Sequence, residues 1–300
     1  MIIDTHNHGY WLSRDADWLV AEMDSLGIDV CWLLTWYHTP EEDNPVYHRG
    51  TNPLHARPDG THGAMPLSDV IAARDRHPTR FVASYCPPPA HPAAPDLFEA
   101  AYRIHGVRVC GEWSYRMPLD DPRAINLFRR AGELKCPVVL HMDVPYLPDG
   151  QGGQRYDTYW IAGTVLNLER ALQACPETVF IGHCPGFWRE ISGDADTSPQ
   201  TRPNGPITPG GRLHRLFDTY PNLWADLSAG SGLNAMSRDP EHARTFIEKH
   251  QDRLLFGRDQ YGDDMMRFLA TLTLDEAVER KVYADNALRL VPADNFKIRA

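Results

Sequence analysis

Short apolar runs alternate along the chain with longer stretches in which apolar residues recur every three to four positions. Apolar runs bounded by polar residues are typical of buried parallel strands, and the stretches between them are typical of amphipathic helices. The pattern predicts strands at residues 1–5, 28–35, 80–85, 106–112, 136–141, 178–183, 222–227 and 252–257. It predicts helices at residues 15–26, 67–77, 95–104, 121–134, 162–174, 210–219 and 239–250, with another near 274–283.

Turn and capping residues agree with several of these boundaries. Gly27 follows the first predicted helix, Asp121-Pro122 opens the fourth, and Lys135-Cys136-Pro137 closes it. Eight strands that alternate with eight helices predict a (β/α)8 TIM barrel, an α/β fold, and a doubly wound open sheet is the alternative. Neither an internal repeat nor a linker is visible, so we expect residues 1–300 to form a single barrel domain.

Three connections that follow predicted strands are much longer than the usual few residues: 36–66, 142–160 and 184–209. The first is rich in His and Pro, the second in Tyr and Trp, and the third in Pro and Gly. Long loops after the carboxyl ends of strands commonly cover a binding site. One interpretation is that these loops form a substrate lid. The other is that they are surface loops without a role in binding or that they form oligomer contacts. The third loop could be poorly ordered.

The composition narrows the function classes. The 300-residue chain has 42% hydrophobic and 23% charged residues, which is typical of a globular enzyme, and a net charge of −10. This charge argues against a nucleic-acid backbone or an anionic membrane as the main partner. No apolar run approaches the roughly 18 residues of a membrane span, and the first residues lack the basic segment of a signal peptide. We expect a cytoplasmic protein that acts on a small molecule.

The cysteines indicate a reducing environment. None of the six forms a C-x-x-C pair, and four lie in or beside apolar strand-like runs, where Cys usually acts as a small buried hydrophobe. A disulfide framework is therefore not expected. The six are Cys31, Cys86, Cys110, Cys136, Cys175 and Cys184.

The first predicted strand delivers two histidines, His6 and His8, spaced i, i+2. Side chains at this spacing in a strand point to the same face, so the two imidazoles would project side by side. Two imidazoles held in this way form half of a divalent-metal site. The apolar residues before His6 distinguish the pair from a chance or tag-like His-x-His.

Polar residues also follow other predicted strands at matching points of the repeat: Glu112, His141, His183 and Asp259. In a barrel of this type, polar residues at the carboxyl ends of strands face the active site. Each alone could be a solvated loop residue, but chance explains the whole set poorly. Asp226 also ends a strand, but strand-end aspartates are often helix caps or turn formers, and we assign it no role.

The sequence motifs resemble those of the amidohydrolase superfamily, within it the amidohydrolase-2 branch that includes aminocarboxymuconate semialdehyde decarboxylase. The matching segments are IIDTHNH, VVLHMD, FIGHCPG, LLFGRD and the terminal ADNALRLV. The resemblance extends from residue 2 to about residue 291. The order and strand placement of these motifs are specific, although each motif alone is not.

The resemblance implies that His6, His8, His141 and Asp259 bind one divalent metal ion. It also implies that His183 lies opposite as a proton donor or an electrophilic contact. Neutral imidazoles and a carboxylate suit Zn²⁺, which would lower the pKa of a bound water to about 7. Mn²⁺ and Fe²⁺ remain alternatives because this ligand set accepts several metals. Asp259 could take the proton from that water if one of its oxygens binds the metal and the other accepts.

Glu112 decides how many ions we expect. In the metal-dependent TatD-like deoxyribonucleases a Glu at the end of the fourth strand bridges or completes a two-metal centre, and Gly111-Glu112 resembles that arrangement. The alternative is that Glu112 hydrogen-bonds a metal-binding histidine or pairs with Arg116. We expect one ion, and two if Glu112 is a ligand, in which case hydrolysis becomes the favoured chemistry.

Four further residues are candidate substrate contacts: Arg116, Arg258, Tyr115 and Trp188. Arginine recognises carboxylate or phosphate through two parallel hydrogen bonds, so an Arg at the mouth of the barrel would indicate an anionic substrate group. Arg258 stands where the branch more often has Ser, which puts the usual substrate contacts in doubt. A surface ion pair is the alternative for either arginine.

The leading functional hypothesis is a metal-dependent hydrolase in which an activated water attacks a lactone, an amide or a related carbonyl. A metal-dependent non-oxidative decarboxylase of a small, possibly aromatic, carboxylic acid is the alternative, because the same ligands serve both reactions. A catalytically inactive binding barrel is the third hypothesis, and it does not explain why every ligand position is filled. Related enzymes are often dimers, so the resemblance also allows a homodimer.

Overall fold

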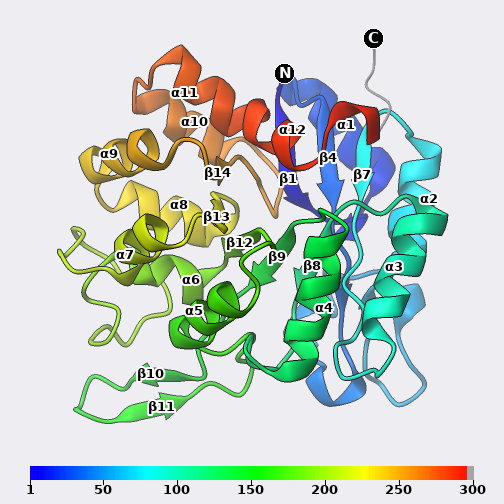
Figure 1. Ribbon diagram of the computed structural model, residues 1–300, viewed down its shortest axis with the longest axis horizontal. Helices are drawn as coiled ribbons and strands as arrows, with labels where there is room; N and C mark the ends of the chain where they lie inside the picture. Colours follow the sequence, from blue (N-terminus) through cyan, green and yellow to red (C-terminus); the bar gives the residue numbers. More distant parts are fainter. Residues whose placement is uncertain (296–300) are drawn as a thin grey trace.

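Eight parallel strands form the centre of the molecule, and each arises from one of the predicted apolar runs (Figure 1). The computed structural model describes residues 1–295. The strands are β1 (Ile3–Asn7), β4 (Val30–Leu33), β7 (Phe81–Ala83), β8 (Cys110–Trp113), β9 (Val138–His141), β12 (Phe180–His183), β13 (Leu223–Asp226) and β14 (Leu254–Leu255).

These strands close into a ring. The ladders form two arcs, β1–β4–β7 and β8–β9–β12–β13–β14. The arcs meet on one side where Tyr85 N donates to Val109 O at 3.0 Å, and on the other where Thr5 N donates to Phe256 O at 3.0 Å. The predicted barrel is therefore confirmed, and the open-sheet alternative is not.

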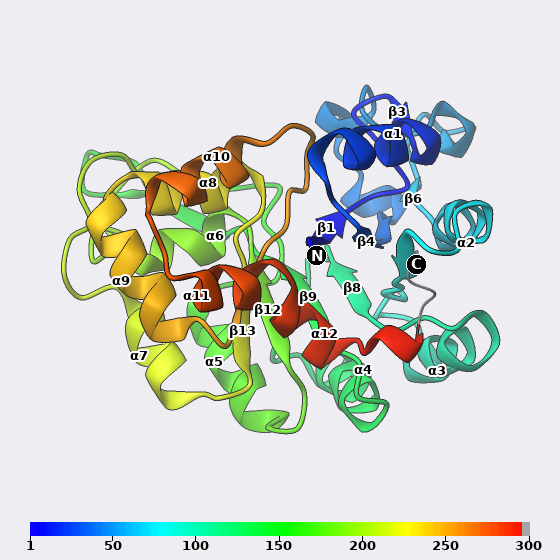
Figure 2. The same cartoon turned by 90° about the horizontal axis from the view of Figure 1, so that it is seen from above.

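Helices surround the ring (Figure 2). Eight of them match predicted helices: α1 (Ala16–Leu26), α2 (Leu67–Arg76), α3 (Ala94–His105), α4 (Pro122–Glu133), α5 (Val165–Ala174), α7 (Arg212–Thr219), α9 (Pro240–His250) and α11 (Glu276–Arg280). Four were not predicted: α6 (Pro185–Trp188), α8 (Ala229–Ser237), α10 (Asp264–Thr271) and α12 (Asn286–Leu290). The predicted caps are present, because Gly27 ends α1 with φ of 70° and the Asp121 side chain accepts from Arg123 N at the start of α4.

Apolar side chains fill the inside of the ring toward its amino-terminal end. Trp32 of β4 and Trp224 of β13 are buried there with one aliphatic side chain from most of the other strands. Ala284 and Ala287, which flank the start of α12, belong to the same cluster. These apolar side chains therefore close the amino-terminal end of the barrel. A site can form at the opposite end, where the carboxyl ends of the strands lie.

The three long segments lie at the carboxyl-terminal end and have structure of their own. The first contains the hairpin of β5 (Trp36–Tyr37) and β6 (Ala64–Met65), and the second the hairpin of β10 (Tyr146–Pro148) and β11 (Gln154–Tyr156). Two short strands, β2 (Tyr10–Trp11) and β3 (Arg14–Asp15), precede α1.

The third segment is anchored, contrary to the expectation of poor order. It opens with α6, whose Trp188 is buried, and continues with a buried turn that contains Arg189 and Glu190. Arg189 donates to Ser198 O, Arg212 pairs with Glu190, and Arg238 pairs with Asp194. Charges on the neighbouring helices therefore fix its path. Within residues 1–295, every helix falls short of the length and apolarity that crossing a membrane requires.

Candidate metal centre

The carboxyl ends of the strands bring one group of polar side chains together. All six residues that the sequence placed at strand ends belong to this group, together with Asp226 of β13. All are buried except Asp259, whose side chain is 18% exposed. The members are His6, His8, Glu112, His141, His183, Asp226 and Asp259.

His6 and His8 point into the same space, as their spacing predicted. The pairing of β1 with β4 shifts register between Asp4 and Asn7, so a bulge aims the end of β1. His6 Nδ1 donates to Asp226 Oδ2 at 2.9 Å and His8 Nδ1 donates to Leu34 O at 2.9 Å. Because each Nδ1 is used as a donor, each Nε2 keeps a lone pair for another partner.

Two carboxylates face these Nε2 atoms. Glu112 Oε2 lies 3.5 Å from His6 Nε2 and 3.6 Å from His8 Nε2. Asp259 Oδ1 lies 3.8 Å and 3.3 Å from the same two atoms. Two nitrogens and two oxygens therefore surround one point without a direct bond between them.

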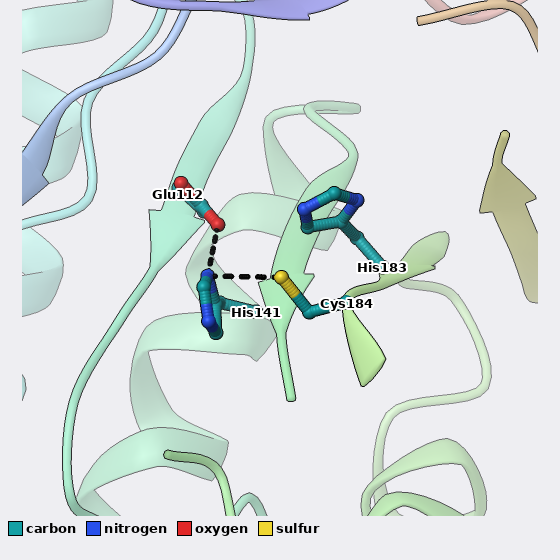
Figure 3. A group of neighbouring side chains, drawn as sticks. All are labelled: Glu112, His141, His183 and Cys184. Atoms are coloured by element: carbon teal, nitrogen blue, oxygen red, sulfur yellow. Dashed lines mark hydrogen bonds and ion pairs between the residues drawn. The ribbon is translucent and has the colours of Figure 1, made fainter. Parts of the chain in front are cut away.

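The other oxygen of Glu112 faces a second group (Figure 3). Glu112 Oε1 accepts from His141 Nδ1 at 2.7 Å, and Cys184 Sγ lies 3.3 Å from the same nitrogen. Glu112, His141, His183 and Cys184 each offer a donor atom within 4.8 Å of the others. Glu112 thus stands between two sets of possible ligands and presents one oxygen to each.

Asp226 orients two histidines at once, a role that sequence reasoning missed. One oxygen accepts from His6 Nδ1 at 2.9 Å and the other from His183 Nδ1 at 3.0 Å, while the Ser228 hydroxyl also donates to it. A carboxylate on the far nitrogen is the usual way to orient a metal-binding imidazole. The interpretation of Asp226 as a mere cap or turn former is therefore wrong.

The carboxylates control the electrostatics of the group. Burial and His183 lower the pKa of His6, but Asp226, Glu112 and Asp259 outweigh them and raise it to about 10. Burial would raise the pKa of Glu112, yet His141 and His6 lower it below its usual range. Three ionised carboxylates in a buried space attract positive charge, which without a metal can only be protons on the imidazoles.

A divalent cation fits this space. His6 Nε2 and His183 Nε2 are buried and have no hydrogen-bond partner among residues 1–295, although buried polar atoms are normally paired. His183 Nε2 lies 3.4 Å from Asp259 Oδ2. Imidazole nitrogens, carboxylate oxygens and a thiol are ligands that suit Zn²⁺ and other first-row ions.

A cavity of about 280 Å³ lies over the group. His8, Glu112, His141 and Asp259 form its floor, so a small molecule inside it would contact the candidate ligands. Its walls come from the long loops, from the β2 hairpin and from α8, and include Trp11, Trp36, Tyr47, Cys184, Arg202 and Ser231.

A neighbouring cavity of about 340 Å³ contains Arg116. It shares Tyr47, Asp143, Pro185 and Arg202 with the first, so the two are adjoining compartments. The Arg116 guanidinium lies over the Tyr159 ring and donates to Glu42 O. Glu112 does not pair with it and bonds His141 instead.

Three of the four candidate substrate contacts are not brought to either cavity. Arg258 points away from the centre and pairs with Asp4 and Glu22. Tyr115 is buried in the outer core and its hydroxyl donates to Cys86 O. Trp188 is buried behind β13, where its indole donates to Asp226 O at 3.1 Å. These side chains support the strands that carry the site and line neither cavity.

Sequence reasoning also missed Cys184 and Asp143. Cys184 immediately follows His183, and the left-handed backbone at this residue (φ of 76°) places its thiol against His141. Asp143 accepts from His141 Nε2 at 3.0 Å. Each lies one or two residues beyond a strand-end histidine, which is the signal that could have identified them.

The comparisons with known proteins agree with this architecture. A family model described as Amidohydrolase matches residues 3–293. No curated protein matches the sequence. The solved structures of similar fold include the 2,6-dihydroxybenzoate decarboxylase from Rhizobium, with a TM-score of 0.60, 16% identity and coverage of 98% of this chain and 99% of that one.

Two further structures show the range of named activities on this fold. A dihydroxybenzoic acid decarboxylase from Polaromonas sp. JS666, solved with bound manganese, has a TM-score of 0.58 and 17% identity over 96% of this chain and 89% of that one. A probable 2-pyrone-4,6-dicarboxylic acid hydrolase from Acinetobacter baumannii has a TM-score of 0.54 and 14% identity over 96% and 98%. At such identities the likeness shows the fold alone, and the names include both lyases and hydrolases.

Proposed function

Because the chain belongs to the amidohydrolase family, whose members are metal-dependent enzymes, we propose that it hydrolyses a lactone, an amide or a related carbonyl compound of small size. The observation that carries this proposal is the position of Glu112. One of its oxygens faces His6 and His8, and the other bonds His141 beside His183 and Cys184. A carboxylate placed in this way can bridge two ions, and two-metal sites are widely used for hydrolysis.

The proposed ligands form two sets joined by Glu112. The first set is His6, His8 and Asp259, and the second is His141, His183 and Cys184. This revises the expectation of one ion and makes His141 and His183 ligands of a second one. The thiol and the imidazoles favour Zn²⁺ over Mn²⁺ or Fe²⁺.

When bound, the metal would supply a Lewis acid that polarises the carbonyl and lowers the pKa of water enough to make it a nucleophile near pH 7. Asp259 is the proposed proton acceptor. Its Oδ1 is directed to His8 and its Oδ2 to His183, and the side chain lines the cavity. It would take a proton from the attacking water at one oxygen and deliver it to the leaving oxygen or nitrogen.

Decarboxylation is the second candidate, and the direct Glu112–His141 hydrogen bond favours it. If this 2.7 Å bond persists in the working enzyme, Glu112 orients His141 and is no bridge. One ion would then be held by His6, His8, His141 and Asp259, with His141 Nε2 exchanging its hydrogen bond to Asp143 for the ion. His183 Nε2 would be free to donate a proton to the carbon that loses CO₂. The fold of the named decarboxylases is compatible with this alternative.

Metal content separates the two candidates. Elemental analysis of the purified protein should find two ions per chain, and Glu112→Gln should lose at least one of them. Glu133→Gln, an exposed glutamate at the end of α4, is the matched control and should keep both. In cobalt-substituted protein, Cys184→Ser should remove a thiolate charge-transfer band in the near ultraviolet.

The reaction itself is read in ¹⁸O-labelled water. Hydrolysis places one labelled oxygen in the acid product from a panel of lactones and amides. One ion per chain in both wild type and Glu112→Gln, together with CO₂ released from aromatic acids without label in the product, would establish the decarboxylase instead.

A further inference from the structure

Helix α8 begins at the wall of the cavity over the candidate metal centre. Its first three residues, Ala229, Gly230 and Ser231, all line that cavity. The amides of the first turn of a helix have no partner within the helix, and they carry the positive end of its dipole. A helix start in this position is suited to an anion when other groups also favour one.

The residue before α8 does not cap it. Ser228 stands at the N-cap position, but its side chain makes no capping hydrogen bond. Its hydroxyl donates to Asp226 and lies 2.8 Å from His183 Nδ1. Ala229 N donates to Arg258 O at 2.9 Å. The amides of Gly230 and Ser231 are thus left without a side-chain cap.

Ser231 provides a second, independent sign of a missing partner. The residue is 1% exposed, and its Oγ has no hydrogen-bond partner among the described residues. A serine in the first turn of a helix is usually satisfied by a nearby carbonyl or by solvent. Here it borders the cavity, so a bound group could supply its partner.

Arg202 places a full positive charge at the same point. A Cβ atom at Gly230 would lie only 3.1 Å from Arg202 Nη1, so the guanidinium packs against the start of α8 where glycine leaves room. Within residues 1–295 it forms no ion pair. Asp143 lines the same cavity, but it bonds His141. Arg202 is an exposed residue on the cavity, so its guanidinium beside the positive end of the helix can meet an anion that enters there.

We propose that Arg202, the first turn of α8 and the Ser231 hydroxyl bind a carboxylate of the substrate. The inference rests on the proposed function in one respect, that the reacting carbonyl lies at the metal centre in the same cavity. A planar group with two oxygens matches the parallel N–H groups of a guanidinium. A monoanion is also easier to place beside three ionised carboxylates than a dianion such as a phosphate monoester. The substrate is then a carboxylated carbonyl compound, and the segment 184–209, which carries Arg202, contributes to its recognition.

Binding of non-reacting probes tests this subsite without turnover. Calorimetry on the metal-loaded protein would compare benzoate with phthalate, isophthalate and terephthalate, whose second carboxylates are differently spaced. At least one dicarboxylate should bind more tightly than benzoate. Arg202→Ala should reduce this advantage by about tenfold or more, as expected for the loss of a charge-assisted hydrogen bond.

Three further variants distinguish recognition from structure. Ser231→Ala removes a buried polar atom without a partner, so it should not lower the melting temperature but should weaken the dicarboxylate. Gly230→Ala should weaken it by displacing the guanidinium without removing the charge. Arg103→Ala, an exposed arginine on α3 outside the cavity, is the matched control and should change nothing.

Equal dicarboxylate binding by wild type and Arg202→Ala would overturn the subsite. So would a phenyl phosphate probe that binds more tightly than every dicarboxylate, because that result assigns the subsite to phosphate. Failure of the proposed function would look different. Benzoate would bind equally well without metal, or no labelled oxygen would enter a product, and the dicarboxylate preference that depends on Arg202 would still be present.

Discussion

Two buried charged clusters lie back to back on the same pair of strand ends. The outer cluster joins Asp4 of β1 to Arg258 beyond β14, with Nε 2.8 Å from Asp4 Oδ2, and Glu22 of α1 completes it at 2.7 Å. The inner cluster uses His6, two residues after Asp4, and Asp259, the residue after Arg258, and it faces the cavity.

The clusters differ in how their carboxylates are paired, although Arg258 Nη2 in the outer cluster is itself buried without a hydrogen-bond partner among residues 1–295. In the outer cluster every carboxylate oxygen of Asp4 and Glu22 accepts a hydrogen bond from the chain. In the inner cluster the Nε2 atoms of His6 and His183 have no hydrogen-bond partner in the described part of the chain, and three carboxylates have only imidazoles to neutralise them. A buried ion network whose carboxylates are satisfied by a guanidinium and backbone amides supports the fold, whereas excess carboxylate charge beside imidazole nitrogens attracts a cation.

Asp259→Asn should have the largest effect, and it should reduce metal binding and turnover without changing the fold. Because the variant keeps the shape but removes the charge that binds metal and accepts a proton, turnover should fall by roughly 10²–10⁴-fold. Circular dichroism should be unchanged, and elemental analysis should find less metal. A variant with full activity and no metal would contradict the proposed role.

Arg258→Leu should do the opposite and affect the fold alone. It leaves the buried Asp4 and the partly buried Glu22 without their cation, which should lower the free energy of unfolding in urea by roughly 3–5 kcal/mol. Metal content of the folded fraction should equal that of wild type. The control is Arg267→Leu on α10, an exposed arginine paired with Asp263, for which a change below about 1 kcal/mol is expected. Loss of metal from folded Arg258→Leu would mean that the clusters are not separate.

The two clusters also show what the sequence can and cannot predict. All eight strands and the six strand-end residues were identified, because buried parallel strands are continuous apolar runs and their ends meet at one face. The direction of Arg258 was not, because the chain leaves the ladder there: the next residue, Asp259, has φ of 51°, and alternation no longer applies.

Other features were hidden by local composition. The sequence Ala229-Gly-Ser-Gly at the start of α8 has the composition of a loop, yet it forms a helix against the cavity. Asp226 has the residue type of a common cap, and only its distances to two histidines reveal its role. Pairings between residues far apart in the chain decide both cases, and local periodicity does not contain them.

Asp226→Asn should have an intermediate effect that sharpens the contrast. The amide keeps the size of the side chain but weakens the hold on His6 and His183, so metal affinity should fall by about 10–100-fold. Competition with a chelator would measure the change. Asp4→Asn is the matched outer variant and should lower stability without changing the affinity. Equal affinity in Asp226→Asn and wild type would show that the two imidazoles are held by packing alone.

The smallest effect should appear in the pH dependence of stability without metal. The inner carboxylates raise the pKa of His6 to about 10, and the pKa of His183 is also raised because Cys184 and Asp226 outweigh its burial. A raised pKa stabilises the folded state fully below about pH 6.5, the pKa of an unfolded histidine, and this stabilisation disappears as the pH rises toward 10.

The melting temperature of chelator-treated protein should therefore fall between pH 6.5 and 10. Metal-loaded protein should show a smaller fall, because the cation replaces the protons. The outer cluster should add nothing in this range, since its cation is an arginine that keeps its proton. An equal decline with and without metal would place the source of the pH dependence elsewhere in the molecule.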